Sequence, residues 1–145
     1  MKPLKAISVI LAMTVISLDA AGAPGYVDWA VLRGLNYKTG RVRDDTKALD
    51  GAEVKMAGFM VPFEDTQQST TEFLLVNVAG ACVHVPPPPP NQIVLVRMAP
   101  GKTAKVFFQQ PIWVVGRLKI ETGDSPYGSV SFGMTATSVE LAKEF

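Results

Sequence analysis

Apolar and polar residues alternate along the second half of the chain. The alternation is cleanest in residues 111–121, which read PIWVVGRLKIE, and in residues 129–141, which read SVSFGMTATSVEL. Successive side chains of a strand point to opposite faces, so this alternation gives one buried and one solvated face. The pattern therefore predicts two half-buried strands.

Three earlier segments also have the composition of strands. They are residues 52–63 (AEVKMAGFMVPF), residues 71–78 (TEFLLVNV) and residues 93–99 (IVLVRMA). Their β-branched and aromatic residues favour strands. Gly58 lies inside the first segment and indicates a bulge or a sharp bend, and Pro62 marks the end of that segment.

These five segments predict a mainly β fold. Turn signals stand between them at Asp50-Gly51, Pro100-Gly101 and Gly123-Asp124. Five is the strand number of an OB-type barrel, in which closure removes most of the free strand edges. We expect a small five-stranded OB-like antiparallel barrel, with an SH3-like barrel as the competing architecture.

The segment before the strands has a different period. Between Val27 and Leu35, apolar residues recur at the three- and four-residue spacing of an amphipathic helix. Asp28 is a residue type that begins helices, and Gly34 or Gly40 can end one. We predict a short N-terminal helix ahead of the sheet.

The N-terminal residues have the order of a secretory signal peptide. A positively charged start is followed by an apolar run over residues 6–18 and then by small residues. The run is shorter than the roughly 20 residues that a membrane-spanning helix needs. We therefore expect a signal peptide at residues 1–22, a single OB-like exported domain at residues 23–145, and no membrane span after signal removal.

Charge and cysteine content narrow the location and the partners. Without residues 1–22 the chain has 12 basic and 12 acidic residues, so we expect no binding to nucleic acid or to an anionic membrane. No cysteine lies near the expected cleavage point, which predicts a periplasmic protein without a lipid anchor. A lone cysteine forms no intramolecular disulfide, so Cys82 is buried, bound to another molecule or chemically used.

The candidate chemistry lies in residues 80–92, which read GACVHVPPPPPNQ. Cys82 is the only cysteine and His84 the only histidine of the chain. Residues two apart in extended backbone project to the same side, so a thiolate and an imidazole would lie together. Both groups bind zinc and copper. The five prolines that follow favour a polyproline II rod about 15 Å long.

Two ligands make an incomplete metal site, because zinc usually takes four. We place Glu64 in the predicted metal site with Cys82 and His84, since zinc favours a carboxylate partner. The alternatives for completing the site are Asp65, Met56, Met60, Asn91 or a second chain.

Two other functions remain open. The first is docking, in which another protein binds the proline segment, and Cys82 and His84 have a structural role. The residues of that surface are Pro86, Pro87, Pro88, Pro89, Pro90, Asn91 and Gln92. The second is catalysis by a thiolate that the imidazole activates. No clear orienting acid or oxyanion loop accompanies the pair, so an enzyme is the less favoured interpretation.

Five motifs are spread over the chain after the leader. They are Trp29 with Leu32, LDGAEVKMAGFMVPFE over residues 49–64, FLLV over 73–76, CVHVPPPPPNQIV over 82–94 and VVGRL over 114–118. Together they resemble the bacterial exported family called domain of unknown function 3299. The resemblance implies a periplasmic or lipoprotein-like protein with an OB-like five-stranded barrel, encoded near ABC-transporter or metal-responsive genes. This chain departs from the lipoprotein members because it has no leader cysteine.

The sequence as a whole predicts a non-enzymatic periplasmic binding protein. It is expected to hold or pass a soft metal ion, zinc or copper, through Cys82 and His84, and no other cofactor is expected. Its expected partner is an envelope protein or an ABC-transporter complex. Docking through the proline segment is the alternative function.

Overall fold

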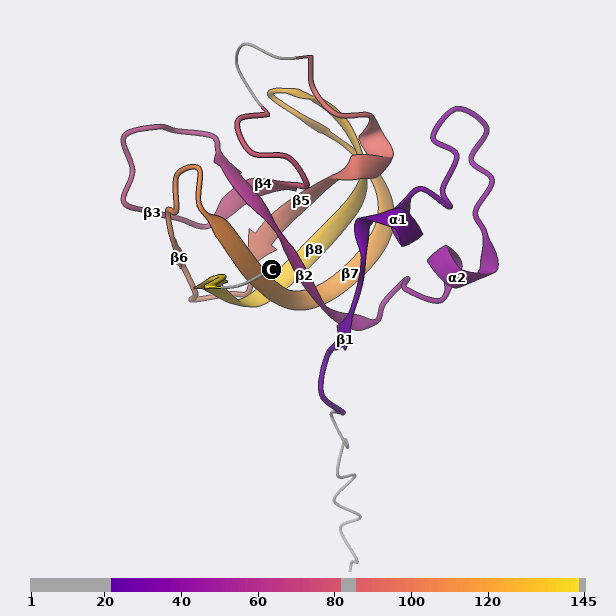
Figure 1. The fold of residues 1–145 in the computed structure, drawn as a ribbon, viewed down its shortest axis with the longest axis horizontal. Helices are drawn as coiled ribbons and strands as arrows, with labels where there is room; N and C mark the ends of the chain where they lie inside the picture. Colours follow the sequence, from indigo (N-terminus) through magenta and orange to yellow (C-terminus); the bar gives the residue numbers. More distant parts are fainter. Residues whose placement is uncertain (1–21, 82–85, 144–145) are drawn as a thin grey trace, which may run out of the picture.

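The computed structural model describes residues 22–81 and 86–143 and shows a mainly β chain (Figure 1). Five of its strands are β2 (Glu53–Pro62), β4 (Glu72–Val76), β5 (Ile93–Met98), β7 (Pro111–Ser125) and β8 (Gly128–Leu141). Each lies where alternation or composition predicted a strand. Three two-residue strands add to them: β1 (Gly25–Tyr26), β3 (Ser69–Thr70) and β6 (Ala104–Lys105).

The main sheet has six strands in the order β1-β2-β4-β5-β8-β7, and β2 also pairs with β7. Residues 53–59 of β2 pair with β7, whereas residues 59–62 pair with β4. The pairings therefore lead from β2 through four other strands and back to β2. Strand β5 runs parallel to β8, and the other pairs in this circuit are antiparallel. Strands β3 and β6 form a separate two-stranded sheet.

The sheet is mixed, so the prediction of a wholly antiparallel arrangement was wrong: β5 runs parallel to β8, and the two-residue strand β1 runs parallel to β2. For β5 and β8 the reason is geometric, because directions cannot alternate at every step around a circuit of five strands. An odd number leaves two neighbours with the same direction, and here they are β5 and β8.

The predicted turn at Gly123-Asp124 was also wrong. Strand β7 continues to Ser125, and the chain reverses at Pro126 and Tyr127.

Two glycines lie where the backbones of neighbouring strands approach closely. A Cβ on Gly58 would lie 2.6 Å from the carbonyl oxygen of Val76, at the point where β2 passes from β7 to β4. The pairing of β2 is regular there, so Gly58 marks a close approach rather than a bulge. A Cβ on Gly116 would lie 2.7 Å from Ala136 Cα, beside a register shift between β7 and β8. Both positions allow the sheet to curve, because neither carries a side chain.

Buried residues form two clusters on the two faces of β4. Phe73 lies in the main cluster, and its neighbour Leu74 lies in a second, smaller one. Val130 of β8 belongs to the second cluster, and Tyr127 from the β7–β8 connection packs against it. Strand β4 is thus covered on both faces, which explains why its sequence is a continuous apolar run.

The N-terminal segment has two single helical turns, α1 (Trp29–Leu32) and α2 (Asp44–Lys47), in place of the expected short amphipathic helix. The Asp28 carboxylate accepts a hydrogen bond from the Ala30 backbone N–H at 2.7 Å and so caps α1. Gly34 follows α1 and is buried against Thr46, with no room for a Cβ. In the described part of the chain, no helix has the length and apolar character needed to cross a membrane.

Candidate functional site

The proline segment offers a stiff apolar surface. Pro86, Pro87 and Pro89 are exposed, whereas Pro88 and Pro90 are half-buried. Pro89 has φ −62° and ψ 155°, which are polyproline II values. Because prolines have no backbone N–H, such a segment presents rings and carbonyl oxygens to its surroundings.

Asn91 and Gln92 fasten the end of the proline segment to the rest of the molecule. Together with Pro90 they form the 3-10 turn η1 (Pro90–Gln92). The Asn91 side-chain amide donates to the Leu35 carbonyl oxygen at 2.9 Å, and the Gln92 amide donates to the Trp29 carbonyl oxygen at 3.3 Å. Asn91 is 9% exposed and Gln92 is 5% exposed. These two residues were expected on a contact surface with the prolines, but they are internal anchors.

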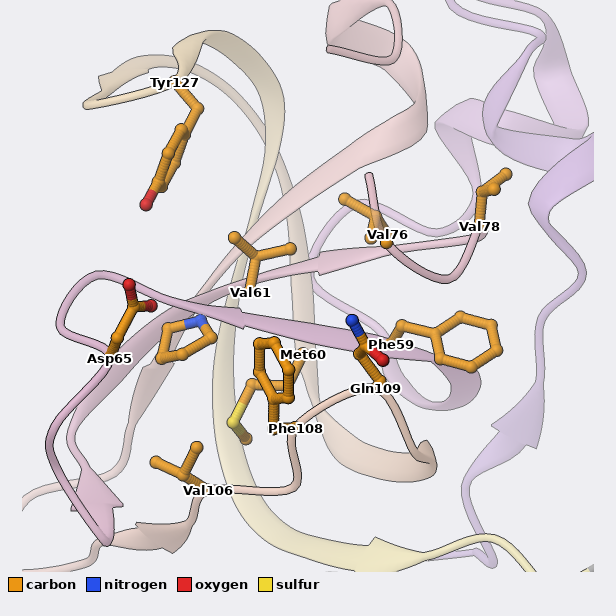
Figure 2. A pocket seen from close by; sticks show the side chains of 12 residues that line it. Phe59, Met60, Val61, Asp65, Val76, Val78, Val106, Phe108, Gln109 and Tyr127 are labelled. Carbon is orange, nitrogen blue, oxygen red and sulfur yellow. The ribbon is translucent and has the colours of Figure 1, made fainter. Parts of the chain in front are cut away.

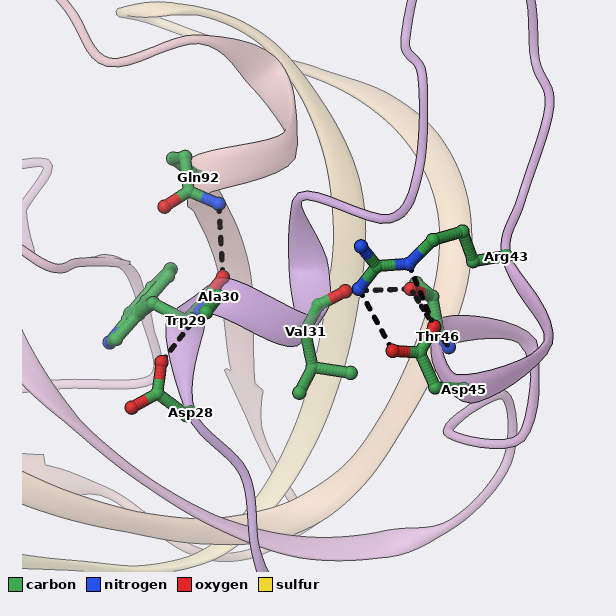
Figure 3. A network of polar contacts seen from close by, with 8 residues as sticks. All are labelled: Asp28, Trp29, Ala30, Val31, Arg43, Asp45, Thr46 and Gln92. Carbon is green, nitrogen blue, oxygen red and sulfur yellow. Dashed lines mark hydrogen bonds and ion pairs between the residues drawn. The ribbon is translucent and has the colours of Figure 1, made fainter.

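The segment that receives these hydrogen bonds is itself fixed, as Figure 3 shows. The Trp29 indole N–H donates to the Ala57 carbonyl oxygen of β2 at 2.7 Å. The Thr46 hydroxyl donates to the Val31 carbonyl oxygen at 2.6 Å and ties α2 to α1. On α2, the Arg43 guanidinium holds the pKa of Asp45 below its usual value through a hydrogen bond. The anchor of the proline segment is therefore connected to the main sheet.

The other side of the candidate loop is also packed. Ala81 is 8% exposed and belongs to the second buried cluster. Gly80 has φ +73°, a left-handed value that glycine adopts without strain. The two predicted ligands Cys82 and His84 lie outside the described residues, between Ala81 and Pro86. The described chain is thus anchored on both sides of them.

The structure does not assemble the other predicted ligands into a cluster. Glu64 is exposed on the connection after β2, and its carboxylate accepts a hydrogen bond from the Gln67 side-chain amide. Met56 is fully buried in the main cluster, and the Asn91 amide is bound to a backbone oxygen. Within residues 22–81 and 86–143, there is no group of three or more His, Cys, Asp or Glu side chains that could hold a metal.

A pocket of about 580 Å³ lies beside Gly80 on the outer side of β2 and β4 (Figure 2). Figure 2 shows Asp65 and Tyr127 on one side of it and Phe59 and Val78 on the other. Its lining residues are Phe59, Met60, Val61, Pro62, Asp65, Val76, Val78, Gly80, Val106, Phe108, Gln109 and Tyr127. The pocket is therefore mostly apolar and contains three aromatic rings and one carboxylate.

The rim of the pocket includes an exposed aromatic side chain on a constrained backbone. Phe108 is 61% exposed, although its backbone forms a parallel bridge with Met60 of β2. Gln109, the next residue, has φ +55°, and no other non-glycine residue in the described part of the chain has a positive φ. Such backbone positions are unfavourable and concentrate at functional sites.

Sequence reasoning missed this pocket, because its lining comes from five separate parts of the chain. Only the adjacent pair Phe107-Phe108, an apolar dipeptide next to two glutamines, gave a local signal. Phe107 is half-buried, whereas Phe108 is exposed at the rim. Spacing alone does not distinguish such a pair from ordinary core residues.

Fold and site together define a small, mainly β protein with a curved sheet, an anchored proline segment and an apolar pocket beside it. Residues 36–141 match the family model DUF3299, described as a protein of unknown function, and the chain belongs to that family. The resemblance inferred from the motifs is thereby confirmed.

The chain was also compared with solved structures and with curated proteins. The crystal structure of a DUF3299 family protein from Pseudomonas aeruginosa PAO1 is 32% identical in sequence, with a TM-score of 0.67. The match covers 86% of this chain and 99% of that chain. No curated protein matches this sequence. The description of the family states no activity.

Proposed function

We propose that the protein is a non-enzymatic binding protein of the periplasm that holds or passes zinc or copper through Cys82 and His84. A thiolate and an imidazole are ligands that both metals accept. The observation that carries the proposal is their position: the only cysteine and the only histidine of the chain stand two residues apart, after the buried Ala81 and before the proline segment that ends at the anchored Asn91. On this proposal residues 1–22 are a signal peptide that directs export.

The anchored residues on both sides of Cys82 and His84 favour metal binding, because they reduce the conformational entropy that the segment between them would lose when a metal binds. Ala81 is buried on one side, and the amides of Asn91 and Gln92 are bound to backbone oxygens on the other. A segment held at both ends has fewer conformations to lose when a ligand binds. The anchored ends therefore support the proposal that this segment is a preorganised binding site.

Glu64 is the further ligand that we propose. It is exposed on the β2–β3 connection, and its hydrogen-bond donor among the described residues is the neutral amide of Gln67. Its carboxylate is therefore available to complete a zinc site with Cys82 and His84. Met56 is a weaker candidate, because it is packed in the main cluster.

We also infer that the sheet is an OB-like five-stranded barrel. The support is the circuit of pairings from β2 through β4, β5, β8 and β7 back to β2. Gly58 and Gly116 allow the close backbone approaches that a strongly curved sheet requires. A closed sheet gives a rigid base from which one loop can present ligands.

Metal titration of the chain without residues 1–22 tests the function. We expect one zinc or copper(I) ion per chain, and we expect the Cys82→Ala, His84→Ala double variant to lose this uptake. Glu64→Gln should weaken zinc binding about 10-fold or more, because a charged ligand is lost. Equally weak uptake by the unmodified chain and the double variant would refute the proposal.

The second candidate function is protein docking through the prolines, with an envelope protein or an ABC-transporter complex as the partner. The exposure of Pro86, Pro87 and Pro89 favours it, because exposed prolines in polyproline II geometry are recognised by aromatic grooves. Thiol labelling separates the two functions. A Cys82 thiol that reacts only after chelation supports the ligand role, whereas one that is shielded with and without chelator supports the structural role.

A further inference from the structure

We propose that the pocket lined by Phe59, Asp65, Phe108 and Tyr127 binds a small organic cation, an ammonium group attached to an apolar body. The proposal uses only residues that the structure describes. The volume of about 580 Å³ lies within the roughly 300–1,000 Å³ of small-molecule sites.

The charge of the ligand follows from Asp65. Among the described residues that line the pocket, Asp65 is the only side chain that is charged at neutral pH. The ion pairs among the described residues join Arg43 to Asp45 and Arg97 to Glu72 and Glu121, and none of them uses Asp65. A cation in the pocket would therefore gain a carboxylate partner, whereas an anion would be repelled.

The aromatic rings favour the same kind of ligand. The faces of aromatic rings attract cations, and Phe59, Phe108 and Tyr127 all line the pocket. Tyr127 stacks on Phe63 with ring centroids 6.4 Å apart and an interplanar angle of 25°. In Figure 2, Phe108 lies between the side that carries Tyr127 and Asp65 and the side that carries Phe59. An ammonium group inside the pocket would thus have three aromatic residues and one carboxylate among the described residues of the lining.

The body of the ligand should be apolar. The rest of the lining is largely aliphatic and includes Val61, Val76, Val78 and Val106. Such walls offer few partners for hydroxyl groups, so a polyhydroxylated ligand would lose hydrogen bonds to water without replacement. An aromatic or branched aliphatic body has no hydrogen bonds to water to lose, and the burial of its apolar surface favours binding.

The rim that carries Phe108 is preformed, which reduces the entropy lost on binding. Its backbone bridge to Met60 fixes the segment along β2, and the positive φ of Gln109 turns the chain immediately after Phe108. An exposed phenylalanine held in this way is a ready contact for a ligand.

Three probes of similar size test the proposal by titration calorimetry and amide NMR. They are 2-phenylethylammonium, neutral 2-phenylethanol and anionic 3-phenylpropanoate. We expect the ammonium probe to bind tightest and the anion weakest, with shift changes at the amides of Val78, Gly80 and Phe108. Equal affinity for the three probes, or no binding at millimolar concentration, would overturn the proposal.

Two exposed carboxylates, Asp65 and Glu140, give a matched pair of variants. Asp65→Asn should weaken the ammonium probe about fivefold and leave 2-phenylethanol unchanged. Glu140→Gln should change neither, because Glu140 does not line the pocket. Phe108→Ala should weaken both probes about threefold or more. The same loss in Asp65→Asn and Glu140→Gln would overturn the assignment of the charge to Asp65.

The Cys82→Ala, His84→Ala double variant separates this site from the metal site. We expect it to keep its affinity for 2-phenylethylammonium while it loses metal uptake. Loss of ammonium binding in this variant would contradict an independent pocket, whatever the result of the metal titration.

Discussion

Two buried amides, Asn91 and Gln92, determine how the proline segment is held. Sequence reasoning placed both on a docking surface with the prolines, because they directly follow the proline run. The carbonyl oxygen that Asn91 meets belongs to Leu35, 56 residues earlier. No local pattern indicates a partner at that distance, so this part of the site was not predictable from the sequence.

Replacing Asn91 tests this anchor. Asn91→Ala leaves the buried Leu35 carbonyl oxygen without its donor, and we expect the free energy of unfolding to fall by about 1–3 kcal/mol. Gln110→Ala, which removes an exposed amide, should change it by less than about 0.5 kcal/mol. Urea unfolding measures both. Similar small losses in the two variants would contradict the anchoring role of Asn91.

Strands were the most predictable elements, and their connections were the least. The alternation of Ile112, Val114 and Leu118 with more exposed neighbours identified β7, and the composition of residues 71–78 identified β4. The end of β7 was missed, because glycine and aspartate in a long hairpin produce the same signal as a turn. Two-residue strands such as β3 have no measurable period. The N-terminal helix was overestimated, because buried Gly34 follows α1 after one turn.

The close approach of β2 to β4 gives a prediction for these elements. Gly58→Ala places a Cβ against the Val76 carbonyl oxygen, which is backbone and cannot move aside. We expect a loss of about 2–4 kcal/mol in the free energy of unfolding. Gly25→Ala is the matched control, because no atom lies within 4 Å of its added Cβ. Equal stability of the two variants would show that the strands separate easily.

For the whole molecule, an odd circuit of strands explains why β5 runs parallel to β8. It also explains why local strand patterns predict the five longer strands but not their directions. The pocket has the same limitation, since Phe59, Asp65, Phe108 and Tyr127 come together only after the chain has folded. The resemblance to DUF3299 was predictable, because the proline motif is contiguous in sequence.

The sharpest single test of the metal proposal is X-ray absorption at the zinc edge of the metal-loaded protein. We expect one sulfur ligand at about 2.3 Å and at least one imidazole nitrogen at about 2.0–2.1 Å. The sulfur should disappear in Cys82→Ala and the imidazole signal should decrease in His84→Ala. A shell of oxygen and nitrogen atoms alone, identical in the unmodified chain and in both variants, would contradict the proposal.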